Sequence, residues 1–361
     1  MAKIGISIYP DCSDFQSDYD YIQKAASLGY KRVFTNLLES QDTKETLLDR
    51  YGRLNQYAKS LGMDVYFDVT PGVMKRFSEH DGDLSFFKEL GATGLRLDES
   101  GSAHQDALIT NNKEGILIEF NASSNHRHLE NVLSFGANKA QMVACHNFYP
   151  QKYTGLSFDL FVKTSEYMKS LGLTVAAFVS SQVEGSFGPW PVNEGLCTVE
   201  DHRFLPLDLQ ARHLYATGLV DDVIIANCYP SDEEMSSLAA INPGVLTIKV
   251  DLDSNISDVE REIALEFSHF VRGDMSEYMA RSTMSRITYA SSDIPVGNTR
   301  DLKRGDVIVV NNEYGRYKGE LHIVLKDMEN DGRKNVIGRV LDEEMILLPY
   351  LTSWKPFKII E

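Results

Sequence analysis

The segments SLGYKRVF (27–34), SLGMDVYF (60–67) and SLGLTVAAF (170–178) share one pattern. In each, an amphipathic stretch ends in Ser-Leu-Gly, and an apolar run follows within a few residues. Glycine suits the end of a helix, because it adopts the left-handed backbone conformation without a steric penalty. The apolar runs suit strands that are covered on both faces. The pattern therefore predicts helices that alternate with buried parallel strands.

Together with similar segments elsewhere, these repeats indicate eight candidate strands: Ile4–Tyr9, Arg32–Leu37, Val65–Val69, Gly94–Leu97, Ile116–Phe120, Gln141–Cys145, Thr174–Val179 and Val223–Ala226. Eight β-α units in about 240 residues match the size of a (β/α)₈ TIM barrel. The competing architecture is an open, doubly wound sheet. It usually has fewer strands, and no G-x-G-x-x-G motif follows the first strand here. We therefore predict a TIM barrel.

The pattern changes toward the C-terminus. Segments 306–311 (DVIVVN), 317–327 (YKGELHIVLKD) and 336–341 (VIGRVL) read as strands separated by turns. In the second segment, apolar residues alternate with Glu320 and His322, as in a half-buried strand. The sequence thus predicts an α/β protein with three parts. These are a TIM barrel at residues 1–242, a connecting segment at 243–270 and a small, mainly antiparallel β-domain at 271–361.

The composition excludes several classes of protein. The 361 residues carry a formal net charge of −16, which argues against nucleic-acid binding, since that needs a basic face. No apolar run approaches the roughly 18 residues of a membrane helix. The first ten residues, MAKIGISIYP, lack the length and the small-residue cleavage site of a signal peptide, so we expect none. The four cysteines are scattered and form no C-x-x-C pair, which is typical of reduced thiols. We expect a cytoplasmic protein without a cofactor, a nucleic-acid partner or a membrane partner, and leave homo-oligomerisation open.

Polar side chains follow all eight predicted strands. The sixth is the densest case, because His146, Asn147 and Tyr149 follow it directly. In a TIM barrel the active site forms at the carboxyl ends of the strands, so these residues should share one rim. The principal rim candidates are Ser7, Tyr9, Glu39, Asp68, Arg96, Asp98, Glu119, Asn121, His146, Asn147, Tyr149, Glu200, His202 and Arg203.

Paired carboxylates near Asn, His and Tyr are the equipment of glycoside hydrolysis. One acid protonates the leaving oxygen, and a second carboxylate attacks or stabilises the sugar cation or activates water. Asp98 and Glu119 are our first candidates for the catalytic carboxylates, and Asp68 is the third. Two structural alternatives stay open: Arg96 and Asp98 could form an ion pair inside the barrel, and Glu119 could only hold a neighbouring side chain.

A metal site is a further alternative, formed from Asp68, Glu119 and His146. No H-x-H or H-E-x-x-H spacing supports it. We therefore expect no metal.

Six segments resemble a known family in order along nearly the whole chain. They are GISIYP (5–10), LRLD (95–98), IEFNAS (118–123), CHNFYP (145–150), TGLS (154–157) and EGLCTVEDHR (194–203). The chain resembles the bacterial 6-phospho-N-acetylmuramidases. This resemblance implies a TIM barrel followed by a cyclophilin-like β-domain. It also implies a cytoplasmic glycosidase of peptidoglycan recycling, which cleaves the β-1,4 bond of N-acetylmuramic acid 6-phosphate–N-acetylglucosamine.

An acidic chain needs a local basic cluster to hold the phosphate and carboxylate of this implied substrate. RSTMSR (281–286) and NNEYGRYKG (311–319) combine arginines with hydroxyls and glycines. From them we predict Arg281, Arg286 and Arg316 as phosphate-binding residues. The predicted substrate-binding residues are Ser7, Tyr9, Arg96, Asn121, His146, Asn147, Tyr149, Glu200, His202 and Arg203.

Two other functions stay open for the same barrel. A sugar-phosphate isomerase or epimerase would need a base together with a metal or a Schiff-base lysine. A non-catalytic sugar-phosphate-binding protein would bind the product without turning it over.

Overall fold

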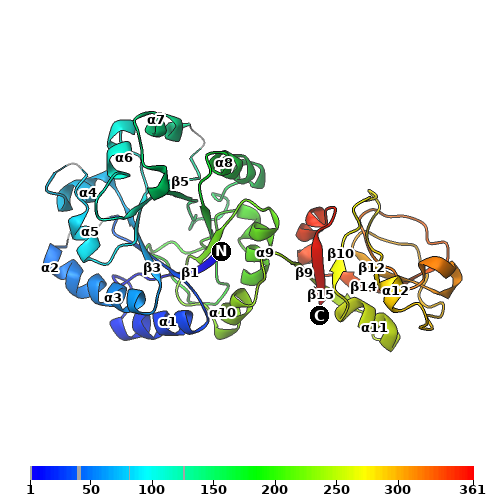
Figure 1. The fold of residues 1–361 in the computed structure, drawn as a ribbon. Coiled ribbons are helices and arrows are strands. Elements are labelled where there is room, and N and C mark those ends of the chain that lie inside the picture. The colour runs from blue at the N-terminus through cyan, green and yellow to red at the C-terminus, as the bar shows by residue number, and fades with distance from the viewer. Residues whose placement is uncertain (1, 39–41, 81, 125–126) are drawn as a thin grey trace. The chain divides into compact units, whose positions relative to one another are not determined.

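The computed structural model describes residues 2–38, 42–80, 82–124 and 127–361, and Glu39 lies outside them. The chain divides into two compact units, Met1–Ile241 and Asn242–Glu361. The first contains the predicted barrel, and the second contains a mixed sheet (Figure 1).

Eight parallel strands of the described residues close into a barrel in sequence order, with β8 paired to β1. All eight predicted strands are confirmed to within a few residues. They are β1 (Lys3–Ser7), β2 (Arg32–Asn36), β3 (Asp64–Val69), β4 (Gly94–Leu97), β5 (Leu117–Asn121), β6 (Met142–Cys145), β7 (Val175–Val179) and β8 (Asp222–Ile225). Figure 1 shows helices surrounding the ring of strands.

The glycines of the Ser-Leu-Gly repeats end helices as predicted. Gly29, Gly62 and Gly172 have φ angles of +89°, +77° and +72°, the left-handed region that glycine adopts most easily. The barrel helices are α1 (Phe15–Ser27), α2 (Lys44–Leu47), α3 (Arg53–Ser60), α4 (Pro71–Phe77), α5 (Ser85–Glu89), α6 (Ala103–Ile109), α7 (His128–Ser134), α8 (Phe158–Ser170), α9 (Leu207–Ala216) and α10 (Asp232–Ala239). Short turns of other helix types lie at η1 (Leu48–Gly52), η2 (Lys139–Gln141) and η3 (Glu200–His202).

The second unit is a seven-stranded sheet in the order β10-β15-β9-β14-β12-β13-β11. Strands β9 and β15 run parallel, and the other neighbours run antiparallel. Its strands are β9 (Leu246–Leu252), β10 (His269–Phe270), β11 (Met279–Ser282), β12 (Asp306–Val310), β13 (Leu321–Val324), β14 (Lys334–Val340) and β15 (Pro356–Ile360). Its helices and turns are α11 (Asp258–Leu265), α12 (Ser285–Thr288), η4 (Asn312–Tyr317) and η5 (Asp342–Tyr350).

Two sequence predictions are corrected in this unit. Residues 243–270, predicted as a connection separate from the β-domain, belong to the second unit, and their strand β9 lies inside its sheet between β15 and β14. The strand predicted at 317–327 is limited to β13, because the chain before it turns through η4 and through Gly315 and Gly319, which both have positive φ.

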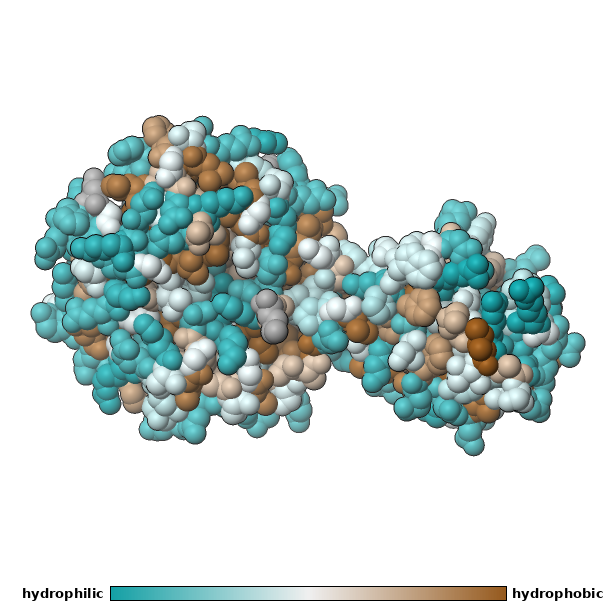
Figure 2. Space-filling view, in the orientation of Figure 1, coloured by the Kyte–Doolittle hydropathy of each residue, from teal (hydrophilic) through white to brown (hydrophobic). Residues whose placement is uncertain are grey.

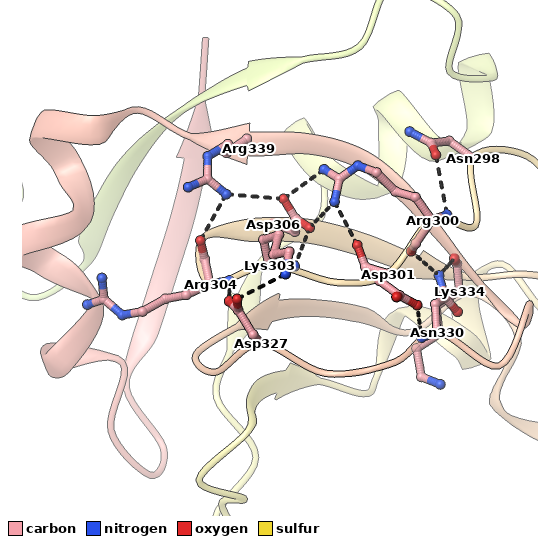
Figure 3. Close-up of polar contacts among 10 residues, drawn as sticks. All are labelled: Asn298, Arg300, Asp301, Lys303, Arg304, Asp306, Asp327, Asn330, Lys334 and Arg339. Carbon is pink, nitrogen blue, oxygen red and sulfur yellow. Dashed lines mark hydrogen bonds and ion pairs between the residues drawn. The ribbon is translucent and has the colours of Figure 1, made fainter.

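A buried carboxylate fixes the connection that leads into β12. Asp306 is fully buried and accepts hydrogen bonds from Arg300 (2.6 and 2.9 Å) and from the backbone N–H of Lys303 (2.7 Å). Arg339 of β14 lies 3.4 Å from the same carboxylate (Figure 3). This network joins residues 300–306 to the sheet.

Hydrophilic residues cover much of the face shown in Figure 2, with apolar residues scattered among them. Within the described ranges, no helix combines the length and the apolar character that crossing a membrane requires.

Candidate active site

Arg96 is the centre of a polar cluster at the carboxyl ends of β3 and β4. It lies opposite Asp68 in the strand register, and its Nη1 donates to Asp68 Oδ1. The same nitrogen lies 3.4 Å from Asp98 Oδ1, and Nη2 donates to Asn147 Oδ1. One guanidinium therefore joins two carboxylates and an amide that the sequence analysis placed at three different strand ends.

The two carboxylates differ in exposure. Asp68 is buried, whereas the Asp98 side chain is 37% exposed. Burial raises the pKa of Asp68 to about 6 against the opposing effect of Arg96, and the negative charges of Asp98 and Glu119 add to the rise. Asp68 is thus suited to carry a proton up to about pH 6, beside a carboxylate that solvent reaches.

Asn147 is fixed from three sides. Its backbone N–H donates to Ser123 Oγ (2.8 Å), and its carbonyl accepts from Thr198 Oγ1 (2.8 Å). Because its Oδ1 accepts from Arg96, its amide nitrogen keeps the two N–H groups as donors. Asn121 lies nearby and donates to the Asp98 carbonyl (3.2 Å). These amides are suited to binding the hydroxyl and acetamido groups of a sugar.

Glu119 is placed elsewhere than the sequence analysis expected. Its side chain is fully buried, and both of its oxygens accept from Arg32 Nη2 (2.7 and 2.6 Å). Arg32 begins β2 and also lies 3.5 Å from Asp222, which begins β8. The pair therefore lies toward the amino ends of the strands, away from the mouth. This arrangement matches the alternative in which Glu119 holds a neighbouring side chain.

Ser7 and Tyr9 join β1 to the end of β8. Ser7 Oγ donates to the Ile225 carbonyl (2.7 Å), and the Tyr9 hydroxyl donates to the Ala226 carbonyl (2.5 Å). Both side chains are buried, and burial raises the pKa of Tyr9 well above its usual value. Both hydroxyl groups therefore donate to backbone carbonyls at the junction of β1 and β8.

His146 points away from the mouth. It is fully buried, with Nε2 2.9 Å from Ser165 Oγ of α8 and Nδ1 3.3 Å from Ser123 Oγ. Burial is the main cause that lowers the His146 pKa to about 3, so the ring is neutral. The histidine orients Ser123, which in turn holds the backbone of Asn147.

Glu200 and Arg203 clamp two loops together. Arg203 donates to both Glu200 oxygens (2.7 and 2.6 Å) and to the Tyr149 carbonyl (2.8 Å). Glu200 also accepts from the backbone N–H groups of Tyr153 and Gly155, both at 2.8 Å. The hydrogen bond from Arg203 is the main cause that lowers the Glu200 pKa to about 2. The clamp holds the loop after β6 against the loop after β7.

His202, the third predicted residue of this segment, is also engaged within the protein. It is buried, with Nε2 2.7 Å from Nδ1 of His213. Burial lowers its pKa well below its usual value, which keeps the ring uncharged.

An aromatic cluster connects β2 and β7 with the loops after β6 and β7. The Trp190 ring is 5.6 Å from that of Phe148, which lies 5.1 Å from Phe178 and 6.2 Å from Phe34. Trp190 belongs to the loop after β7 and is half-buried. Such a ring is suited to stack on a sugar.

The sequence analysis gave no role to Ser123, which follows the fifth strand, and did not name Thr198, although both residues position Asn147. Ser123 belongs to the IEFNAS segment and Thr198 to the EGLCTVEDHR segment. Nothing in the residue types distinguishes these hydroxyls from others in the same loops.

A cavity of about 570 Å³ lies on the other side of the β4 terminus, next to α4 and α6. Leu97 and Glu99 line it, whereas Asp98 between them contacts Arg96. Its walls include neither Asp68 nor Asp98.

The predicted phosphate-binding arginines lie in the second unit. Arg281 is on β11, Arg286 is on α12 beside Glu320 (2.6 Å), and Arg316 is exposed on η4. In the described part of the chain, no three His, Cys, Asp or Glu side chains are grouped so as to hold a metal ion.

Comparison with known families accounts for nearly the whole chain. The family described as 6-phospho-N-acetylmuramidase, N-terminal, matches residues 4–240, and its C-terminal counterpart matches residues 246–360. The family name implies a glycosidase with a phosphorylated amino-sugar substrate. No curated protein matches the chain.

Two solved structures are similar over their full lengths. An uncharacterized B. cereus protein is 44% identical with a TM-score of 0.92, and the match covers 100% of this chain and 99% of that one. A conserved protein of unknown function from an Enterococcus faecalis locus is 27% identical with a TM-score of 0.74, covering 99% and 96%. The fold of the present chain is thus shared with both.

Proposed function

Since the chain belongs to the 6-phospho-N-acetylmuramidase family, we propose that it hydrolyses the β-1,4 bond of N-acetylmuramic acid 6-phosphate–N-acetylglucosamine. The reaction would be a cytoplasmic step of peptidoglycan recycling. The observation that carries this proposal is the pair of carboxylates, Asp68 and Asp98, at one nitrogen of Arg96. A buried acid beside a partly exposed carboxylate is the pair that glycoside hydrolysis needs.

Asp68 is the proposed general acid. With its pKa raised to about 6, it holds a proton under conditions where an ordinary aspartate has lost it. As the bond between C1 and the glycosidic oxygen breaks, this proton moves to that oxygen, and N-acetylglucosamine leaves as a neutral alcohol. Arg96 faces the carboxylate that remains and stabilises its charge.

Asp98 is the proposed second carboxylate. It either attacks the sugar cation at C1 or orients the substrate's acetamido oxygen to do so, and water then completes hydrolysis. Both carboxylates accept from Arg96 Nη1, which keeps their facing oxygens close together. Two oxygens that contact one nitrogen lie closer together than the roughly 6.5–9.5 Å that separates the carboxylates of inverting enzymes, so we propose retention of configuration. Asn147 and Trp190 would hold the sugar ring.

A chromogenic aryl glycoside of 6-phospho-N-acetylmuramic acid tests this proposal, beside its unphosphorylated twin. We expect cleavage of the phosphorylated compound alone, and proton NMR of the first product should show the β anomer. Asp64→Asn is the matched control, because Asp64 begins the same strand as Asp68 and pairs with Lys3 (2.7 Å). No cleavage of either compound by the folded protein would refute the glycosidase.

A further inference from the structure

Three arginines gather around β11 in the second unit. Arg272 precedes the strand, and its backbone N–H donates to the Arg281 carbonyl (2.8 Å). Asp274 lies between the two side chains: it accepts from Arg272 Nε, and its carboxylate is 3.5 Å from Arg281. Arg286, on the helix that follows, donates to Glu320 (2.6 Å).

Strand pairing connects these arginines. Arg281 of β11 is the direct antiparallel partner of His322 on β13, so the two side chains lie on the same face of the sheet. His322 Nε2 is 3.0 Å from the second oxygen of Glu320. Arg286, Glu320, His322 and Arg281 therefore form a continuous row across two strands and a helix.

This row contains unsatisfied polar atoms. Within the described residues, His322 Nδ1 of the row is buried and has no hydrogen-bond partner, and neither has Ser285 Oγ, which precedes Arg286 in the chain. Such atoms are uncommon in folded proteins, because each costs free energy. Burial mainly lowers the pKa of His322, and the nearby positive charges of Arg281 and Lys334 lower it further. An anion beside Arg281 would offset these positive charges.

The charges of the cluster also favour an anion. Three arginines, Arg272, Arg281 and Arg286, face two carboxylates, Asp274 and Glu320, which leaves an excess positive charge. The whole chain, by contrast, carries a net charge of −16. Arginine guanidinium groups bind phosphate through paired N–H donors more specifically than lysines do.

Aromatic rings adjoin the cluster. The Arg286 guanidinium lies 5.8 Å from the Tyr317 ring, which is 42% exposed. Tyr317 lies 5.2 Å from Tyr314, and Arg333 covers the Tyr314 ring at 3.9 Å. An exposed ring beside an anion site is suited to pack against a cyclic group of the ligand.

We propose that Arg272, Arg281 and Arg286 bind the phosphate of a ring-bearing phosphate ester in the second unit. A sugar phosphate and a nucleoside monophosphate share this chemistry. The inference does not depend on hydrolysis in the barrel, because binding is measured without turnover.

Calorimetric titration of the full chain tests the site. Glucose 6-phosphate and adenosine monophosphate are the two probes, and glucose and adenosine are their phosphate-free controls, all at one ionic strength. We expect one phosphate ester to bind and its phosphate-free partner to bind at least about tenfold more weakly. The ester that binds more tightly identifies the class. Equal binding with and without phosphate would overturn the proposal.

Variants locate the binding. Arg281→Ala should lower the affinity for the phosphate ester by about tenfold or more. Arg304→Ala should leave the affinity within twofold, because Arg304 is exposed and its guanidinium points away from the Asp306 network (Figure 3). Unchanged affinity in Arg281→Ala would overturn the inference.

A second variant separates lost binding from lost folding. Arg286→Lys keeps a cation beside buried Glu320 but removes the paired N–H donors, so binding should weaken while the circular dichroism spectrum is unchanged. Unchanged affinity in this folded variant would also count against the site. A chain that cleaves the phosphorylated glycoside yet binds neither probe would refute this inference and leave the proposed function intact.

Discussion

Two buried arginines inside the same barrel differ in what surrounds them. Arg32, at the start of β2, is enclosed by Glu119 (2.6 Å), Asp222 (3.5 Å) and the Tyr66 ring (3.8 Å). Arg96, near the carboxyl end of β4, contacts buried Asp68 but also Asp98, whose side chain is 37% exposed. The first cluster is closed by protein groups, and the second opens to solvent through one carboxylate.

The difference separates stability from chemistry. Arg32, Glu119 and Asp222 are all buried, so this cluster presents no group to a substrate, and the loss of one partner would leave an unpaired buried charge. Arg96 instead contacts one buried acid, Asp68, and one partly exposed carboxylate, Asp98, so two neighbouring acids lie in different environments. Such environments move the pKa values of neighbouring acids apart, which is the basis of acid-base catalysis.

The largest expected effect lies at the mouth. Asp98→Asn should lower kcat/KM for the phosphorylated aryl glycoside by about 10²–10⁴-fold, because it removes the charge of the second carboxylate. The melting temperature should change little, since Asp98 is partly exposed. Steady-state kinetics and a thermal melt measure both quantities. Activity above a tenth of the parent's would exclude Asp98 from the reaction.

Substitution of Glu119, at the amino ends of the strands, should have the opposite effect: a large loss of stability and little change in activity. Glu119→Gln leaves Arg32 without its main counter-charge and should lower the free energy of unfolding by about 3–5 kcal/mol. The kcat of the folded fraction should stay within a few-fold of the parent's. Urea denaturation followed by circular dichroism gives the first value. A variant as stable as the parent but inactive would instead show that Glu119 acts in catalysis.

The pH dependence of kcat/KM tests whether Asp68 is the general acid. Because the Asp68 pKa is raised to about 6, the proposed acid loses its proton above that pH. We expect kcat/KM to fall about tenfold per pH unit on this limb. The limb should be absent in the residual activity of Asp68→Asn. An alkaline limb unchanged in that variant would assign it to another group.

The raised pKa of Asp68 also makes the free energy of unfolding depend on pH. The folded-state pKa of Asp68 lies above its ordinary value of 3.8, so the folded protein binds this proton more strongly than the unfolded chain does. The resulting stabilisation is complete below about pH 4 and is lost as the pH rises through about 6. Urea titrations at pH 4 and pH 7 should therefore show a smaller pH difference for Asp68→Asn than for the parent.

The sequence predicts the barrel well because local signals repeat in it. The Ser-Leu-Gly helix ends and the apolar runs each report on a few adjacent residues, and all eight strands follow from them. The site depends on longer-range geometry. The alternation of side chains along a strand directs both Asp68 and Glu119 toward the barrel interior. Only the pairing of Glu119 with Arg32, 87 residues away, shows that the Glu119 side chain lies toward the amino ends of the strands. His146 likewise turns toward α8, a contact that strand periodicity does not encode.

A third arginine–carboxylate pair gives the smallest expected effect. Glu200→Gln weakens the clamp on Arg203 and on the backbone N–H groups of Tyr153 and Gly155, and should cost about 1–2 kcal/mol of unfolding free energy at pH 7. Because the Glu200 pKa falls from 4.5 to about 2 on folding, its stabilisation is present above about pH 4.5 and is lost as the pH drops toward 2.

The difference between Glu200→Gln and the parent should therefore shrink between pH 7 and pH 3. Urea denaturation at the two pH values measures it. Glu194→Gln is the matched control, because Glu194 lies in the same loop and its side chain accepts only a weaker set of contacts from Lys152 (3.0 and 3.8 Å). We expect less than about 0.5 kcal/mol there, at either pH. A loss equal for both variants would mean that the loop, and not the clamp, sets the stability of this side of the barrel mouth.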